Sequence, residues 1–351
     1  LAHEKRWDES YFRAIGLGML ADEGFARIGS SVVDAATPLG KGLTKAAALD
    51  LGLRAGTPVG AAVIDAHAGG IGTVGAAGAD ATAPDARERL AYIYGTSACA
   101  IATTADPAFV QGIWGPYYSS MLPGMWMNEG GQSAAGAGLD FLLRMHPALP
   151  LAQDRAKTAK LTLLAWLESQ AVAQQPTLSE TARLSKRIQV VPEFLGNRAP
   201  FSDADALAII SGIALDDSLQ NLIELYVAGL CGIAYGARQI VEALKAQGIP
   251  LKQMIVSGGA ALSPLVRQVL ADGAGLEVAV VTADEPVLLG SAILGAVAGK
   301  GFASVPEAMA KMSRLGSVYS PAGGAIAAFH DAKFQIYGEM QKLDRSNRKI
   351  M

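Results

Sequence analysis

One carboxylate, Asp65, stands at the end of an otherwise apolar run, Thr57–Asp65, whose composition predicts a buried strand. A carboxylate in that place would lie at the carboxyl edge of a sheet, where ligand sites of α/β proteins are found. There it could accept a proton from a hydroxyl nucleophile, as a general base does. Asp is also typical of a helix N-cap, and the small-residue segment Ala66–Gly78 that follows is predicted to be helical. The position alone leaves both interpretations open.

Two glycine-containing turns could hold phosphate groups. Gly95-Thr96-Ser97 separates two short strand-like runs, residues 90–94 and 98–103, and predicts a hairpin whose N–H groups and hydroxyls can face phosphate oxygens. Ser257-Gly258-Gly259-Ala260 lies between a predicted strand and a predicted helix, where glycine lets a ligand approach the backbone. Taken alone, each could equally be an ordinary turn. The pattern GxxxxGK[ST] is absent, which excludes a P-loop.

A second acidic residue, Glu129, lies in the stretch Asn128–Ser133, which predicts a helix entrance with a carboxylate and two amides. Glu129 could bind the hydroxyls of a sugar, or it could interact favourably with the dipole of the following helix. Gly136 and Asp140 come next on that predicted helix. These residues add polar groups without by themselves deciding between the two interpretations.

Gly70-x-Gly72-x-x-Gly75 matches the dinucleotide-binding fingerprint and would make the protein a dinucleotide-dependent oxidoreductase. That fingerprint needs its first glycine in the turn directly after a strand, and an acidic residue at the end of a second strand about 20 residues on. Here four residues intervene after Asp65, and the available acids lie in a polar segment. Close packing of a helix through its glycines is the favoured interpretation.

The predicted elements that must position these residues change character near residue 89. A charged hinge, residues 80–89, follows the strand and helix around Asp65 and is the predicted domain boundary. Beyond it, strands and helices alternate, which is typical of an α/β domain with a mixed sheet. The predicted strands lie at residues 90–94, 98–103, within 112–127, 254–256 and 276–281. The predicted helices cover residues 133–145, 156–173, 217–247, a stretch beginning at Ser263-Pro264, 286–299, 305–313 and 326–345.

Composition excludes several classes of protein. With 51% hydrophobic and 17% charged residues, the 351-residue chain is not intrinsically disordered. A net charge of −3 implies no broad basic field, so nucleic acid and anionic membrane are not expected as partners. No apolar run is long enough to span a membrane, and no signal peptide is apparent. The two cysteines fit a reducing cytoplasm, and the four histidines have no metal-ligand spacing.

The order of these motifs resembles the FGGY family of carbohydrate kinases, and most of all its ribulokinase-like branch. The stretches "DAH", "GTS", "EGGQSA" and "GNRAP", which are typical of that branch, occur here in that order, at Asp65–His67, Gly95–Ser97, Glu129–Ala134 and Gly196–Pro200. The resemblance covers essentially the whole chain. It implies an actin-like (ribonuclease H-like) fold of two domains with mixed sheets, and a sugar and ATP with Mg²⁺ in the cleft between them.

The resemblance also implies roles for single residues. Asp65 would be the base that deprotonates a terminal hydroxyl of the sugar, and Glu129 would contact the sugar. Asp140 and Ser263 stand where glycerol kinases carry an amide. The residues implied to bind ATP are Gly95, Thr96, Ser97, Gly136, Asp140, Gly258, Gly259 and Ser263. Residues 1–89 would be the end of the sugar-binding domain and residues 90–351 the nucleotide-binding domain, and a homodimer is one expectation for the assembly.

The chain departs from the family pattern in one respect. The family's first domain opens with an Asp-x-Gly-Thr phosphate loop, and no such sequence precedes Asp65. We therefore expect an ATP-dependent kinase of a ketopentose, such as D-ribulose, or of a related pentulose or pentitol, of which this chain alone is inactive or weakly active. The alternatives are a non-catalytic actin-like module that binds nucleotide, or one part of a split kinase.

Overall fold

The computed structural model describes residues 1–78 and 85–351. Within that part of the chain, seven strands form one sheet in the order β3-β4-β2-β1-β7-β8-β9. The pairs β1–β7 and β7–β8 are parallel, whereas the other four neighbouring pairs are antiparallel. The predicted mixed sheet is therefore confirmed. The bounds are β1 Arg89–Tyr94, β2 Ala98–Thr104, β3 Trp114–Tyr118, β4 Trp126–Gln132, β7 Gln253–Ser257, β8 Glu277–Val281 and β9 Leu315–Tyr319, with β5 Gln189–Val191 and β6 Ile209–Ser211 in a separate two-stranded sheet.

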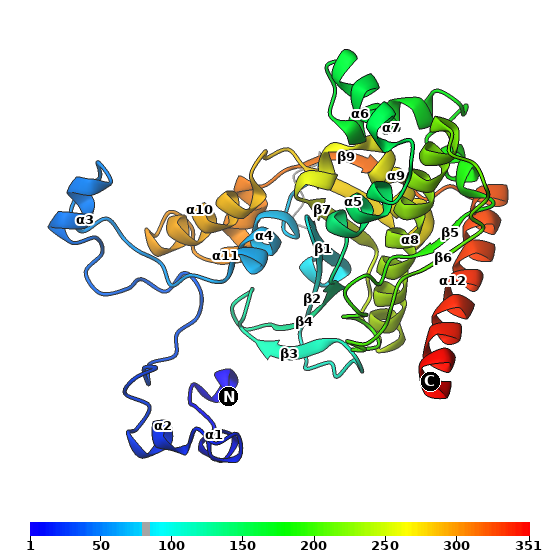
Figure 1. The fold of residues 1–351 in the computed structure, drawn as a ribbon. Helices are drawn as coiled ribbons and strands as arrows, with labels where there is room; N and C mark the ends of the chain where they lie inside the picture. Colours follow the sequence, from blue (N-terminus) through cyan, green and yellow to red (C-terminus); the bar gives the residue numbers. More distant parts are fainter. Residues whose placement is uncertain (79–84) are drawn as a thin grey trace.

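Helices cover both faces of the large sheet (Figure 1). The helices α4, α10 and α11 lie on one face, and α5, α8 and α9 lie on the other, with α12 packed outside α8 and α9. The helices are α1 Glu9–Ala14, α2 Gly18–Asp22, α3 Lys45–Asp50, α4 Asp65–Thr73, α5 Gly136–Arg144, α6 Leu149–Thr158, α7 Leu163–Val172, α8 Leu219–Ala246, α9 Pro264–Ala274, α10 Pro286–Ala298, α11 Val305–Met312 and α12 Gly324–Ile350. Short 3₁₀ helices are η1 Ala2–Glu4, η2 Ala86–Glu88, η3 Glu180–Ser185 and η4 Gly259–Leu262.

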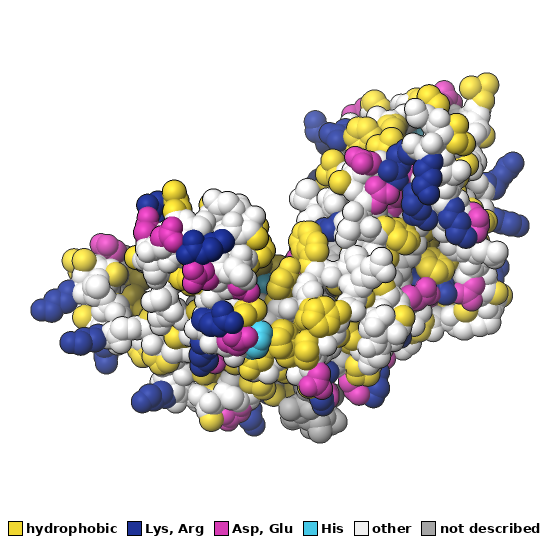
Figure 2. All heavy atoms as spheres, turned by 90° about the horizontal axis from the view of Figure 1, so that it is seen from below, with side chains coloured by type: hydrophobic (Ala, Val, Ile, Leu, Met, Phe, Trp, Pro, Cys, Tyr) yellow, Lys and Arg dark blue, Asp and Glu magenta, His cyan; other side chains and the backbone are white. Residues whose placement is uncertain are grey.

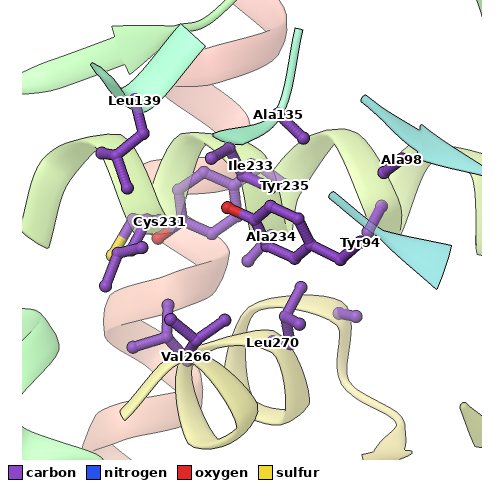
Figure 3. Packing of buried hydrophobic residues seen from close by; sticks show 14 of the residues in the cluster. Tyr94, Ala98, Ala135, Leu139, Cys231, Ile233, Ala234, Tyr235, Val266 and Leu270 are labelled. Atoms are coloured by element: carbon purple, nitrogen blue, oxygen red, sulfur yellow. The ribbon is translucent and has the colours of Figure 1, made fainter. Parts of the chain in front are cut away.

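Strand β1 divides the core into two clusters because its side chains alternate between the faces of the sheet. Leu90, Tyr92 and Tyr94 pack with the helices α5, α8 and α9, whereas Ala91 packs with α4 and α10. In Figure 3 the ring of Tyr94 reaches from its strand toward α8 and α9. All of these side chains are buried, as expected for a central strand with covered faces.

Helix α9 begins as the sequence predicts. The Ser263 hydroxyl accepts a hydrogen bond from the backbone N–H of Val266 at 3.0 Å, and Pro264 is the first helical residue. The helix predicted over residues 156–173 is wrong in its continuity, because Lys160 adopts φ 56° and interrupts it. α6 therefore ends at Thr158, and α7 begins after Thr162, which caps it.

The predicted strand over residues 57–65 is also wrong. Residues 57–61 exchange backbone hydrogen bonds with residues 36–43, among them the Leu39 N–H to the Val59 carbonyl at 2.8 Å. This pairing is irregular and yields only one isolated bridge, between Pro38 and Gly60, so no strand forms. Val59 is 36% exposed and Ile64 58% exposed, so the run is not buried. Asp65 consequently begins helix α4 in place of ending a strand.

Residues 1–64 contain only the short elements η1 and α1 to α3. Of these, η1 contacts the edge of the sheet, where the centroid of the His3 ring lies 6.2 Å from that of Tyr118 in β3 and 5.4 Å from that of Trp126 in β4. Many apolar side chains remain exposed in this region, among them Tyr11 at 59% and Leu49 at 82%. Figure 2 shows one face of the whole molecule, where hydrophobic side chains gather near the middle beside a hollow. Of the predicted hinge, residues 80–84 lie outside the described residues, and Asp85 caps η2.

The glycines of the dinucleotide-like pattern serve helix packing, as the favoured interpretation predicts. Gly70 and Gly72 lie inside α4, not in a turn after a strand. A Cβ on Gly72 would come within 2.0 Å of the Pro286 carbonyl oxygen, and one on Gly290 within 1.8 Å of the Ala68 carbonyl oxygen. The two helices α4 and α10 therefore touch backbone to backbone. This geometry removes the basis for a dinucleotide-binding site at Gly70–Gly75.

Candidate active site

The turn Gly95–Ser97 is held by hydrogen bonds on both sides. The Gly95 N–H donates to the Ser97 carbonyl at 2.9 Å and closes the hairpin between β1 and β2. The first N–H groups of α5 then donate to the turn: Gly136 to the Gly95 carbonyl at 3.0 Å and Ala137 to the Thr96 carbonyl at 3.1 Å. A Cβ on Gly136 would lie 2.7 Å from the Gly95 carbonyl oxygen. The turn and the start of α5 thus form one unit that requires glycine at position 136.

A cavity of about 480 Å³, the α5–α9 cavity, opens beside this unit. Six of the eight residues predicted to bind ATP line it, although they come from three separate parts of the chain. Thr96 is exposed at the rim of the cavity, whereas Leu139, Tyr226 and Val266 form an apolar part of its wall. The six are Gly95, Thr96, Gly136, Asp140, Gly259 and Ser263.

The other two predicted residues lie nearby but do not line this cavity. Gly258 adopts φ 88°, and a Cβ there would lie 2.5 Å from the Tyr94 carbonyl oxygen, so glycine is required for the turn itself. Ser97 faces a neighbouring cavity, described below. Sequence reasoning missed Glu168 of α7, which also lines the α5–α9 cavity and accepts a hydrogen bond from the Leu265 N–H at 3.0 Å. No local pattern marks Glu168, because its partner is 97 residues away.

Asp65 lies at the first position of α4 and is exposed. Its Oδ1 atom accepts the N–H of the next residue, Ala66, at 2.7 Å. The N-cap position belongs to Ile64, whose side chain makes no capping bond. A carboxylate in the first turn interacts favourably with the helix dipole. The side chain is accessible to solvent.

Glu129 lies in the middle of strand β4, so the predicted helix entrance around it is wrong, and so is its interaction with a helix dipole. The residues 126–132 pair with both β2 and β3, and α5 begins only at Gly136. The Glu129 carboxylate is 8% exposed and is bound at both oxygens. Oε1 accepts from Arg198 Nη2 at 2.8 Å, and Oε2 lies 3.4 Å from His67 Nε2. We call His67, Glu129 and Arg198 the Glu129 cluster.

Charge within the Glu129 cluster favours the ionised carboxylate. The hydrogen bond from His67 and the positive charge of Arg198 hold the pKa of Glu129 below its usual range, although burial acts in the opposite direction. The Arg198 guanidinium also stacks over the Trp114 ring, 4.4 Å from its centroid. Sequence reasoning included His67 and Arg198 only as letters of motifs and gave them no role.

Cys99 connects Asp65 with the Glu129 cluster. Its Sγ accepts a hydrogen bond from Arg198 Nη1 at 3.7 Å, and the side chain is half-buried. Burial raises the pKa of the Cys99 thiol, and the charges of Arg198, Glu129 and Asp65 all act on it. Asp65 precedes His67 by two residues on α4, and His67 contacts Glu129. The base candidate and the buried carboxylate therefore border the same region.

A second cavity, of about 630 Å³, lies next to this region, and we call it the Arg198 cavity. It shares the Gly95–Ser97 turn with the α5–α9 cavity, because Ser97 lines it. Its remaining lining contains both polar and apolar residues and comes from β3, from the segment between β4 and α5 and from the loop after β5. That lining consists of Trp114, Ser133, Leu195, Gly196, Asn197, Arg198, Ser202 and Ala204.

Two negative observations apply to residues 1–78 and 85–351. No group of three or more His, Cys, Asp and Glu side chains in this part could hold a metal ion. No helix there is both long and apolar enough to cross a membrane.

Comparisons with known proteins agree with this geometry. Residues 90–299 match the C-terminal domain of the FGGY family of carbohydrate kinases. An FGGY carbohydrate kinase domain-containing protein from Homo sapiens is 39% identical over 99% of this chain and 64% of its own length. A D-ribulokinase from Saccharomyces cerevisiae is 32% identical over 84% of this chain and 44% of its own length. The chain thus spans less than two thirds of the curated relatives it matches.

Solved structures show the same fold at lower identity. A xylulose kinase from Rhodospirillum rubrum superimposes with a TM-score of 0.68 and 22% identity, covering 90% of this chain and 57% of that one. The Plasmodium falciparum glycerol kinase with ADP gives a TM-score of 0.69 and 18% identity, covering 99% of this chain and 60% of that one. The predicted actin-like fold is therefore confirmed.

Proposed function

The chain belongs to the FGGY family of carbohydrate kinases, and we propose that it takes part in the ATP-dependent phosphorylation of a ketopentose. One observation carries this proposal: six residues predicted to bind ATP, from three separate segments, line the α5–α9 cavity. The proposed substrate class is a pentulose such as D-ribulose, supported by 32% identity to a D-ribulokinase. Residues 1–89 would contribute to the sugar side and residues 90–351 to the nucleotide side.

The α5–α9 cavity suits a nucleotide because its two ends differ. Leu139, Leu164 and Val266 offer an apolar surface for a base, whereas the Gly95–Ser97 turn offers N–H and hydroxyl groups to phosphates. Within the described residues, the Thr96 hydroxyl has no hydrogen-bond partner. Thr96 is therefore proposed to donate to a terminal phosphate oxygen.

The proposed reaction is an in-line phosphoryl transfer. Asp65 accepts the proton of a terminal sugar hydroxyl while that oxygen forms a bond to the γ-phosphorus. The bond from this phosphorus to the β–γ bridging oxygen breaks, and ADP leaves with the bonding electrons. Mg²⁺ supplies neutralisation of the phosphate charge, and the nucleotide's own oxygens and water would hold it, because the described residues include no metal-binding group.

The test combines nucleotide binding with a substrate panel. We expect the purified protein to bind ATP in calorimetric titrations and Thr96→Val to weaken that binding about tenfold, since a hydrogen bond to a charged group is lost. The matched control is Thr104→Val at the far end of the adjoining strand β2, where the hydroxyl donates to the Asp106 carbonyl. Its ATP affinity should equal that of the wild type.

The panel contains D-ribulose, L-ribulose, xylulose and ribitol, with phosphorylation followed by ADP release. Phosphorylation of a pentulose above the others supports the proposal. Nucleotide binding without transfer to any sugar would instead favour the non-catalytic module or the part of a split kinase. Failure to bind nucleotide at all would overturn all three interpretations.

A further inference from the structure

Arg198 presents hydrogen-bond donors that the protein itself does not fully use. Of its five N–H groups, one on Nη2 donates to Glu129 and one on Nη1 donates to the weak acceptor Cys99 Sγ. The buried Nε atom has no hydrogen-bond partner among the described residues. A guanidinium group cannot accept hydrogen bonds, so any ligand that meets these N–H groups must bring acceptor atoms.

His67 lies on the other side of the Glu129 carboxylate. Its Nδ1 atom lies 2.8 Å from the Ser120 carbonyl oxygen, and its Nε2 atom lies 3.4 Å from Glu129 Oε2. Since Arg198 Nη2 donates to Oε1, both oxygens of the carboxylate are engaged.

The Glu129 cluster adjoins the proposed site of chemistry. His67 follows Asp65 by two residues on α4, and Asp65 acts electrostatically on Cys99, the neighbour of Arg198. Arg198 also lines the Arg198 cavity, which shares the Gly95–Ser97 turn with the α5–α9 cavity. A sugar whose terminal hydroxyl reaches Asp65 would therefore extend along the donor-rich side of Arg198.

We propose that Arg198 binds the carbonyl oxygen of the ketose and thereby selects a ketopentose over the corresponding pentitol. This inference rests on the proposed function and names the specificity residue of that same site. A carbonyl oxygen only accepts, which matches a donor-only guanidinium. The hydroxyl of a pentitol at the same place brings a proton that needs an acceptor, and the carboxylate next to Arg198 is already bound at both oxygens.

The stacking on Trp114 fixes the plane in which Arg198 offers its donors. A guanidinium 4.4 Å above the ring centroid is restrained in orientation, whereas a lysine ammonium would keep the charge without the planar fork. Arg198→Lys should therefore lose selectivity although it retains the positive charge. This separates recognition by geometry from a general electrostatic effect.

The experiment compares D-ribulose with ribitol in the wild type, Arg198→Met and Arg198→Lys. The measured quantity is kcat/KM for the ketose divided by kcat/KM for the pentitol. We expect this ratio to fall about 10- to 100-fold in both variants, because one charge-assisted hydrogen bond is lost. The effect should lie mainly in KM for the ketose. Binding of ATP should stay unchanged, because Arg198 does not line the α5–α9 cavity.

Arg238→Met is a closely matched control. Arg238 also forms an ion pair, with Glu242 at 2.8 Å, and stacks on an aromatic ring, Phe334, at 4.2 Å. The side chains of Arg238 and Arg198 are 21% and 19% exposed, so their removal disturbs folding to a similar degree. Arg238 joins α8 to α12, away from the site. Its variant should keep the ketose-to-pentitol ratio of the wild type.

A second measurement does not depend on turnover. Iodoacetamide should alkylate the half-buried Cys99 but not the fully buried Cys231. D-Ribulose should protect Cys99 in the wild type at a concentration at least tenfold lower than ribitol, and this difference should vanish in Arg198→Met.

Three results would overturn the inference. They are an unchanged ketose-to-pentitol ratio in Arg198→Met, the same loss in Arg238→Met, and absence of Cys99 protection by D-ribulose. If D-ribulose is phosphorylated and Thr96→Val weakens ATP binding in such a case, the proposed function stands and only the role of Arg198 fails.

Discussion

The two cavities that share the Gly95–Ser97 turn are built in different ways. The α5–α9 cavity is lined by a backbone turn, by the start of a helix that begins with glycine and by apolar side chains. The Arg198 cavity, in contrast, adjoins a buried cluster of charged side chains. The first depends on where the backbone lies, and the second on which charges are present. Substitutions should therefore distinguish the two cavities. An added Cβ should weaken the function of the α5–α9 cavity, and the removal of a charge should weaken that of the Arg198 cavity.

The largest effect is expected for Asp65→Asn on the charged side. An amide keeps the shape of the side chain but cannot accept the substrate's proton, so kcat should fall by about 10² to 10⁴. ATP affinity should be unchanged, because Asp65 does not line the α5–α9 cavity. Steady-state kinetics with the preferred pentulose and calorimetric titration with ATP measure the two quantities.

The control for Asp65→Asn is Glu307→Gln. Glu307 also lies in the first turn of a helix, α11, and its loss removes a similar interaction with the helix dipole. Normal turnover is expected for this variant. Near-normal turnover in Asp65→Asn itself would show that another group takes the proton.

The next effect concerns Gly136→Ala on the nucleotide side. The new Cβ would lie 2.7 Å from the Gly95 carbonyl oxygen, so the turn and the start of α5 must move apart. We expect ATP affinity to fall at least about tenfold, since donors at the turn would no longer be held in position. Protection of Cys99 by D-ribulose should be affected much less.

Gly338→Ala provides the comparison for a glycine without such a contact. It lies in α12, and a Cβ there meets no atom within 4 Å. This variant should keep ATP affinity and gain up to about 1 kcal/mol in the free energy of unfolding. Equal ATP affinities for the two glycine variants would contradict the role given to the backbone at Gly136.

Local signals in the sequence were sufficient for several elements of the second half of the fold. The strands around residues 90–103, the cap at Ser263 and the long helix near residues 217–247 each have a pattern that is complete within the segment. The strand predicted at residues 57–65 failed because its pairing with residues 36–43 yields only one isolated bridge, which the pattern of one segment cannot reveal. Strand β4 was not predicted because its glycines and polar residues are not typical of a strand.

The candidate site shows the same division. Six of the residues that the family resemblance implied to bind ATP meet at one cavity, and all but Asp140 lie at a turn or at the start of a helix. The partners of Glu129 could not be derived, since His67 and Arg198 are 62 and 69 residues away from it. Such contacts depend on how the sheet and the loop after β5 pack, and a motif gives only the identities of the residues.

The smallest effect is expected for Glu129→Gln, and it appears in stability. Arg198 and His67 would lose their shared counter-charge, which should lower the free energy of unfolding at pH 7 by about 1–3 kcal/mol. Glu339→Gln is the control, because its pair with Lys342 is exposed and should contribute about 0–1 kcal/mol. Urea denaturation followed by circular dichroism measures both variants.

The pH dependence of this effect identifies its origin. The folded protein holds the pKa of Glu129 below the value of 4.5 that it has when unfolded. The stabilisation is thus complete above about pH 4.5 and is lost as the pH falls from there through the folded-state pKa. The difference in stability between the wild type and Glu129→Gln should therefore shrink below pH 4.5. A difference that stays constant from pH 7 into this acid range would mean that the cluster stabilises by packing, and the contrast between a charge-built and a backbone-built cavity would no longer hold.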